Sequence, residues 1–105
     1  MNNIEKTIEI TELYDYYKEL LTEKQKHYFE LYFFEDLTFQ EIGEEAGVSR
    51  AAIHDSISKT VNTLEDIETK LKLKVKADFI KDKIGEYKQA KIDVNTLISS
   101  IEGEF

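Results

Sequence analysis

The chain has 105 residues without cysteine or proline, and its 22 carboxylates outnumber its 14 lysines and arginines, giving a net charge of −8. This composition excludes disulfides and cysteine-ligated metals, and the length supports one domain with an appended helix. The acidity opposes nucleic-acid binding, because a domain that binds phosphates usually has a basic face. Since charges interrupt the apolar residues after Met1 and no uncharged run reaches membrane-spanning length, we expect a soluble, cytoplasmic protein.

Scarce glycine and the absence of alternating, strand-like runs predict an all-α fold. Between Ile4 and Leu21, apolar residues at helical spacing mark one face of a first helix, which Thr7 or Thr11 is expected to cap. The residues of this face are Ile4, Ile8, Leu13, Tyr17, Leu20 and Leu21, with Tyr14 and Tyr16 beside them. We interpret the tyrosines as core rather than as a platform for stacking bases, because aromatic side chains carry much of the core area in small domains.

A second helix is predicted from Glu23 to about Phe34. Thr22 and Gln25 have the spacing of a capping box, in which each side chain bonds the other residue's backbone N–H. An aromatic stripe then follows at helical spacing and consists of Tyr28, Phe29, Tyr32 and Phe33. His27 is interpreted as a surface residue, since no second histidine or cysteine lies at metal-ligand spacing.

The stretch from Thr38 to Leu64 predicts a helix-turn-helix unit. Thr38 and Glu41 form another capping box before a short helix, Phe39 to Ala46. Gly47 should end that helix, because glycine takes the left-handed conformation cheaply. Ser49 is expected to cap the next helix, which begins at about Arg50 and buries a stripe of apolar residues at helical spacing: Ile53, Ile57, Val61 and Leu64.

The apolar stripe continues past Leu64 to Val75, which predicts either one long helix or two helices joined by a bend between Leu71 and Val75. From Ala77 to Ile101 the apolar residues follow a heptad seam, with Lys91 as a polar exception and with Asn95 as a possible start of a separate helix. Such a short seam must fold back or pair with a second chain. We therefore expect a helix-turn-helix domain over residues 4–68 and a C-terminal helical segment over 69–105 that supports a homodimer.

The second helix of a helix-turn-helix lies in the major groove, and its early exposed side chains contact bases. Because Ile53 and Ile57 point inward, the candidate contact residues are Arg50, Ala51, His54, Asp55, Ser58 and Lys59. Arg50 could bond guanine bidentately, whereas His54 and Ser58 could bond bases or phosphates. Asp55 would repel phosphates, and two permanent cations predict weak non-specific affinity. The alternative is that the same face binds a protein, for which an acidic surface suits a basic partner.

Catalysis has little support in the sequence. His27 and His54 belong to different predicted helices, and the neighbours His54 and Asp55 point about 100° apart around a helix. The many glutamate pairs are typical of a solvated helix face, and no glycine-rich phosphate loop is present. We therefore predict a protein that is not an enzyme and that has no metal or cofactor.

The run LTEKQKHYFELYFFEDLTFQEIGEEAGVSRAAIHDSISKTVNTLE, Leu21 to Glu65, resembles two related groups of proteins. Broadly, it is similar to region four of bacterial sigma factors, through a helix that starts at a T-x-x-Q step and the later LT-x-x-EI-x-x-x-x-GVSR pattern. More closely, the stretch LYDYYKELLTEKQKHYFELYFFEDLTFQEIGEEAGVSRAAIHDSI, Leu13 to Ile57, resembles the YlxM family of small bacterial helix-turn-helix proteins. That resemblance covers about half of the chain and leaves out the heptad region.

The YlxM resemblance implies an accessory or regulatory protein of the signal recognition particle pathway, with the particle's GTPase or the ribonucleoprotein itself as a partner. The likeness to sigma region four implies DNA binding. This chain departs from that pattern because it lacks a basic recognition helix and has Asp55 in it, which opposes promoter recognition. A sequence-specific, dimeric DNA-binding regulator is the alternative function.

Overall fold

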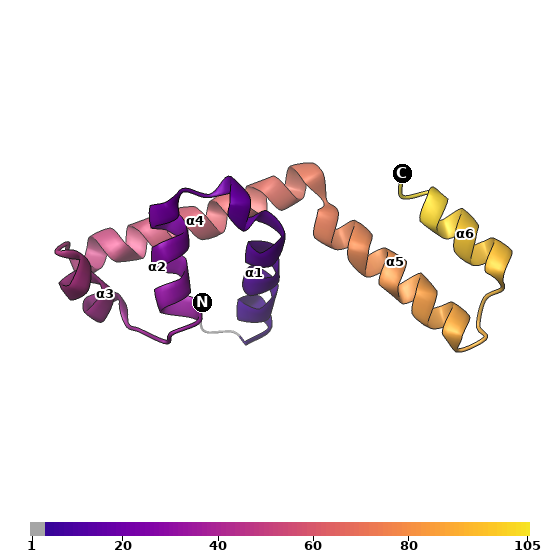
Figure 1. Ribbon diagram of the computed structural model, residues 1–105, viewed down its shortest axis with the longest axis horizontal. Coiled ribbons are helices and arrows are strands. Elements are labelled where there is room, and N and C mark those ends of the chain that lie inside the picture. Colours follow the sequence, from indigo (N-terminus) through magenta and orange to yellow (C-terminus); the bar gives the residue numbers. More distant parts are fainter. Residues whose placement is uncertain (1–3) are drawn as a thin grey trace. The chain divides into compact units, whose positions relative to one another are not determined.

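The computed structural model describes residues 4–105, which form helices and no strand, so the predicted all-α class is confirmed (Figure 1). The chain divides into two compact units, the first ending at Leu71 and the second beginning at Lys72. The elements of the first unit are α1 (Ile4–Tyr17), a 3₁₀ turn η1 (Lys18–Leu20), α2 (Glu23–Phe33), α3 (Phe39–Ala46) and α4 (Arg50–Leu71). Those of the second unit are α5 (Leu73–Lys88) and α6 (Val94–Glu102).

Helix α4 is the element against which the rest of the first unit packs. It contacts α1, α2 and α3, and Figure 1 shows α1 and α2 lying across it with α3 at its N-terminal end. Its buried stripe is the predicted one, Ile53, Ile57, Val61 and Leu64. Because these residues recur every three or four positions, one side of α4 faces the core from Ile53 to Leu64, and the opposite side faces outward. Leu71, which continues the predicted stripe, is 47% exposed.

The buried face of α1 differs from the predicted one. Ile10, Leu13, Tyr14 and Tyr17 lie in the core, whereas Ile4 and Ile8 are 78% and 52% exposed. At 100° per residue, Ile4 and Ile8 lie almost opposite the middle of this buried face, so one stripe could not include both sets. Leu20 was also predicted on the buried face and is 64% exposed, because the chain has left the α-helix for η1 at that point.

Both candidate caps of the first helix were wrong, whereas the predicted cap of the second is confirmed. Thr7 and Thr11 lie within α1, and the Thr11 hydroxyl donates to the Ile8 carbonyl at 3.0 Å instead of capping. At α2 the Gln25 N–H donates to Thr22 Oγ1 at 3.1 Å, and the Thr22 N–H donates to Gln25 Oε1 at 2.9 Å. This capping box satisfies two backbone donors that the start of the helix leaves open.

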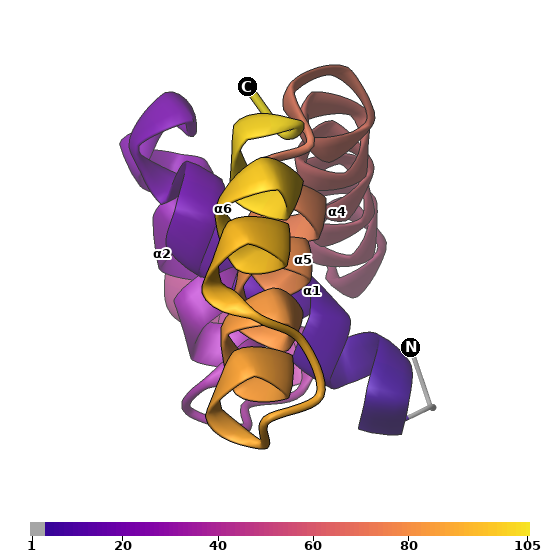
Figure 2. The same ribbon diagram turned by 90° about the vertical axis from the view of Figure 1, so that its right-hand side faces the viewer.

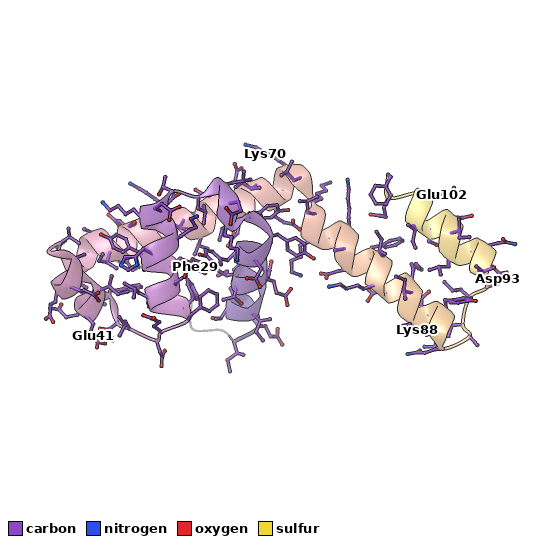
Figure 3. All side chains as sticks on the ribbon, viewed as in Figure 1. Phe29, Glu41, Lys70, Lys88, Asp93 and Glu102 are labelled. Atoms are coloured by element: carbon purple, nitrogen blue, oxygen red, sulfur yellow. The ribbon has the colours of Figure 1, made fainter. Side chains whose placement is uncertain are left out.

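Two of the three clustered tyrosines belong to the core, as predicted. The Tyr14 ring stacks on Phe29, with ring centroids 4.3 Å apart, and Phe29 is fully buried between α1 and α2 (Figure 3). The Tyr14 hydroxyl donates to Glu30, and the Tyr17 hydroxyl donates to Glu68 Oε1 on α4 at 2.5 Å. Tyr16 is 39% exposed.

The second unit is a helical hairpin in which α5 and α6 lie side by side (Figure 2). The predicted continuous heptad helix is therefore wrong: α5 ends at Lys88, and α6 begins at Val94, one residue before the predicted alternative start. Asp93 caps α6 by accepting the Thr96 N–H at 2.7 Å, and this hydrogen bond lowers the pKa of Asp93. Of the two alternatives for the preceding stretch, the break is the observed one, since Lys72 is left-handed with φ 57° between α4 and α5.

Replacing Tyr14 with phenylalanine should make folding stability less sensitive to alkali. Burial, followed by the hydrogen bond to Glu30, raises the pKa of Tyr14 above its ordinary 10.0. The unfolded chain then loses this proton at a lower pH than the folded chain, so stability is full below about pH 10 and falls above it. Urea unfolding from about pH 8 to about pH 11 should show a shallower decline for Tyr14→Phe than for the exposed control Tyr16→Phe. Equal declines would contradict this role of Tyr14.

Candidate nucleic-acid or partner interface

The turn between α3 and α4 has the geometry that the sequence predicts. The Thr38 hydroxyl accepts the Glu41 N–H at 3.1 Å, and Glu41 accepts the Thr38 N–H at 3.0 Å, which completes the capping box of α3. Gly47 ends α3 in the left-handed conformation, with φ 74°. Ser49 Oγ then accepts the Ala52 N–H at 3.0 Å and caps α4. The direction in which α4 leaves the turn is therefore fixed by local hydrogen bonds.

Gly43 is a second glycine that the turn requires, and no role was predicted for it. A Cβ atom placed on Gly43 would lie 2.7 Å from the carbonyl oxygen of Val48, a contact closer than real Cβ atoms make. The Gly43 carbonyl also accepts the N–H of Val48 at 2.9 Å. The absence of a side chain thus allows the turn to fold back against α3. A glycine inside a predicted helix, one turn before the helix-ending Gly47, was the available signal.

The predicted contact residues lie on the outward side of α4. Ile53 and Ile57 are fully buried, so the positions between them face away from the core. Five of the six candidates are exposed, namely Arg50, Ala51, His54, Asp55 and Lys59, and Ser58 is half-buried. Their exposure leaves them accessible to a partner, and their binding role stays a prediction.

Phe39 brings two of these residues together. The Arg50 guanidinium lies 5.8 Å from the centroid of the Phe39 ring, and the His54 ring meets the same ring edge-on at 5.2 Å. Tyr32 stacks on Phe39 with centroids 4.5 Å apart. Arg50 and His54 are one helical turn apart, so both project from one side of α4 over an aromatic support. The supporting role of Phe39 and Tyr32 depends on how α2, α3 and α4 meet and has no signal in the sequence.

The charges around this surface are mostly negative. His54 Nδ1 lies 3.9 Å from Asp55 Oδ1, which is too long for a hydrogen bond, and the Asp55 side chain is 76% exposed. The pair thus lacks the bond that would orient a catalytic histidine. On α3, Glu44 and Glu45 are exposed. A phosphate approaching Arg50 or Lys59 would meet these carboxylates as well.

A groove with a volume of about 430 Å³ lies between α2 and α3. Its lining includes the apolar residues Tyr28, Leu31, Ile42 and Ala46, with Lys24 and Glu45 among its charged residues. Glu45 therefore belongs both to the acidic side of α3 and to the groove. This combination of apolar surface and charge is typical of sites that bind a side chain from another protein.

Residues 4–105 contain no group of three or more histidine, aspartate or glutamate side chains placed to hold a metal ion. Over the same range, none of the helices combines the length and the apolar character needed to cross a bilayer.

Comparison with known families identifies this arrangement. Residues 4–103 match the UPF0122 family, described as "Putative helix-turn-helix protein, YlxM / p13 like". The chain belongs to this family. A UPF0122 relative from Mycoplasma mycoides is 48% identical over 101 residues, covering 96% of this chain and 89% of the relative. Another from Streptococcus pyogenes serotype M5 is 40% identical over 108 residues, covering 94% and 96% of the two chains.

The UPF0122 match confirms the YlxM resemblance and extends it. The resemblance found in the sequence stopped at Ile57, whereas the family match continues through the α5–α6 hairpin to residue 103. The residues of the hairpin up to 103 therefore lie within the part of the chain that the family model matches. The family description supports the helix-turn-helix class, and the contact residues and the partner remain to be proposed.

Substituting Gly43 should destabilise the first unit through a specific backbone clash. Gly43→Ala should cost about 1 to 3 kcal/mol, because the Val48 carbonyl must move. Gly47→Ala should cost about 1 to 2 kcal/mol through its left-handed backbone. Gly85→Ala is the control, since nothing lies within 4 Å of a Cβ there and alanine favours a helix. Thermal unfolding followed by circular dichroism measures all three, and a Gly43→Ala protein as stable as wild type would contradict the close approach.

Proposed function

We propose that this protein is a non-enzymatic accessory or regulatory protein of the signal recognition particle pathway. It acts in the cytoplasm, binds a protein or ribonucleoprotein through the acidic surface of its helix-turn-helix unit, and works as a homodimer. The particle's basic, RNA-binding GTPase is the expected partner. The resemblance to the YlxM family is the reason for proposing this pathway. The negative charge of the first unit is the physical observation that supports binding to a cationic partner.

The first unit carries a net charge of −9 over residues 1–71, although it holds the helix that would read DNA. Arg50 and Lys59 are the two permanent cations among the candidate contact residues, and Asp55 lies between them. Two phosphate contacts predict that log K falls with log salt with a slope of only about −2, and that affinity for random DNA is weak. A cationic protein surface would instead be attracted over most of the unit.

The acidic side of α3 is the part of this surface that best suits a protein partner. Glu44 and Glu45 are exposed there, and Glu45 also lines the groove between α2 and α3. A basic helix or loop could place an apolar side chain in the groove while its lysines or arginines meet these carboxylates. Buried apolar contacts surrounded by charge pairs give both affinity and orientation.

A capture experiment tests this proposal. The immobilised full-length chain should retain the purified particle or its GTPase at physiological salt. The double variant Glu44→Lys/Glu45→Lys should lose most of that capture, because it replaces attraction with repulsion beside the groove. Glu9→Lys/Asp15→Lys, which makes the same change in net charge at exposed positions on α1, should retain it. Failure of the wild-type chain to retain either partner would reject the proposal.

The alternative function is a sequence-specific DNA-binding regulator that acts as a dimer. The observation in its favour is the support that Phe39 gives to Arg50 and His54, which holds two hydrogen-bond donors on the outward side of α4. Arg50, His54 and Lys59 would be the residues that contact DNA. Two copies would then recognise a site with two-fold symmetry.

Removing the Arg50 side chain should abolish specific DNA binding if this alternative holds. Duplexes selected from a random library by the wild-type chain should shift in gel electrophoresis, and Arg50→Ala should remove the shift without changing the helical circular dichroism signal. Lys70→Ala is the matched control, because Lys70 is an exposed cation near the far end of the same helix and pairs with Asp66 at 2.9 Å. Equal shifts for all three proteins would contradict base reading by Arg50.

A further inference from the structure

The α5–α6 hairpin has two apolar stripes and no buried residue. On α5 the stripe recurs at alternating four- and three-residue spacings and consists of Leu73, Ala77, Ile80, Ile84 and Tyr87. On α6 it consists of Val94, Leu97, Ile98, Ile101 and Phe105, the last residue lying just beyond the helix. None of the residues from Lys72 to Phe105 is buried. Folded segments of fewer than roughly 40 residues usually need a metal, a disulfide or oligomerisation for stability.

Each stripe is only partly covered within the hairpin. On α6, Leu97 and Ile101 are half-buried, whereas Val94 and Ile98 are each 48% exposed. On α5, Ala77 and Ile80 are half-buried, whereas Leu73, Ile84 and Tyr87 are 45%, 37% and 44% exposed. The exposed residues of the two stripes form the apolar surface that remains to be covered.

The charges beside the two stripes have opposite signs. On α5, lysines flank the stripe on both sides at seven-residue spacing, with Lys74, Lys81 and Lys88 on one side and Lys76 and Lys83 on the other. By the 100° spacing of a helix, the α6 stripe has Glu102 on one side and Glu104 on the other. Two α5 helices placed together would therefore repel each other, whereas α5 against α6 is complementary.

The burial pattern identifies which charged side is used within the hairpin. Lys76 and Lys83 are half-buried, as is Glu104, so these sides of α5 and α6 face inward. Lys81, Lys88 and Glu102 are exposed, whereas Lys74, on the same side of α5 as Lys81, is half-buried and pairs with Asp78 at 2.7 Å. One face of the hairpin therefore has Lys81 and Lys88 along α5 and Glu102 along α6, and the exposed apolar residues of the two stripes, which we call the apolar strip, lie between them.

We infer that the hairpin of a second copy of this chain covers the strip and forms a four-helix bundle, with each α5 beside the partner's α6. This inference rests on the homodimer proposed above and specifies its interface. With the two-fold axis along the bundle, the helices alternate α5, α6, α5, α6 around the ring, so all neighbours are antiparallel and no two lysine-flanked stripes adjoin.

The same arrangement places opposite charges at one height. Lys81 lies seven residues before the end of α5 at Lys88, and Glu102 lies eight residues after the start of α6 at Val94. Because α5 and the partner's α6 run antiparallel from connections at the same end of the bundle, Lys81 should lie close to Glu102 of the partner subunit. The two-fold axis repeats this pair on the other side.

Sedimentation equilibrium of full-length variants tests the inference. The wild-type chain should have twice the mass of one chain, and Ile98→Asp should have the mass of one chain while keeping the helical signal of the first unit. Ile8→Asp is the matched control and should remain a dimer, because Ile8 is 52% exposed on α1. Lys81→Glu and Glu102→Lys should each raise the dimer dissociation constant about tenfold, since the symmetry applies each change twice. The double variant should return it close to the wild-type value.

The possible failures are distinguishable. If the wild-type chain sediments as a monomer, both the homodimer and this interface are overturned. That result is also the one expected if the hairpin binds a different, acidic protein instead of a second copy. A dimer that persists in Ile98→Asp and is insensitive to both charge reversals would leave the homodimer in place and overturn the α5–α6 interface. Two weakened single variants without recovery in the double variant would overturn the pairing of Lys81 with Glu102.

Discussion

The burial of one side of α4 is the constraint on which the first unit depends. Ile53, Ile57 and Leu64 are fully buried, and α1, α2 and α3 all pack against the helix that carries them. Because side chains on a helix have fixed angular positions, burying this stripe also determines which residues project outward. The cap of Ser49 and the close approach at Gly43 then fix where the helix begins relative to α3. The candidate interface is thus a consequence of core packing, and its chemistry depends on which residues occupy the outward positions.

The residues at these outward positions of α4 do not suit DNA binding, although the helix-turn-helix shape does. A helix-turn-helix presents a helix of suitable size to the major groove, yet here that helix exposes Asp55 and belongs to a unit with net charge −9. Long-range electrostatics acts before any base contact forms, so the acidic surface disfavours the approach of a polyphosphate and favours that of a cationic protein. The second unit differs in kind, since it has a net charge of +1 over residues 72–105 and lacks a buried residue. These differences are the basis for proposing partner binding by the first unit and self-association by the second.

The sequence predicted those features that depend on local chemistry. Both capping boxes, the left-handed Gly47 and the buried stripe of α4 follow from residue types at short spacings, and all are confirmed. The errors arose where tertiary context decides. Ile4 and Ile8 have the spacing of an amphipathic face, but the residues of α1 that pack into the core are Ile10, Leu13, Tyr14 and Tyr17. The break at Ala90 has a left-handed backbone without glycine or proline to announce it, so the predicted heptad seam continued through it, whereas the break at Lys72 was one of the two predicted alternatives. Phe39 was predicted as an apolar residue of its helix, but its contacts with Arg50 and His54 depend on how α3 meets α4.

The central claim is that this helix-turn-helix prefers a cationic partner to DNA, and parallel titrations test it most directly. The labelled full-length chain would be titrated with the purified signal recognition particle and with random duplex DNA at physiological salt. Our account predicts saturable binding to the particle, weakened as salt rises, and no more than weak binding to the duplex. Nanomolar binding to a defined DNA site under the same conditions, without measurable binding to the particle, would contradict it.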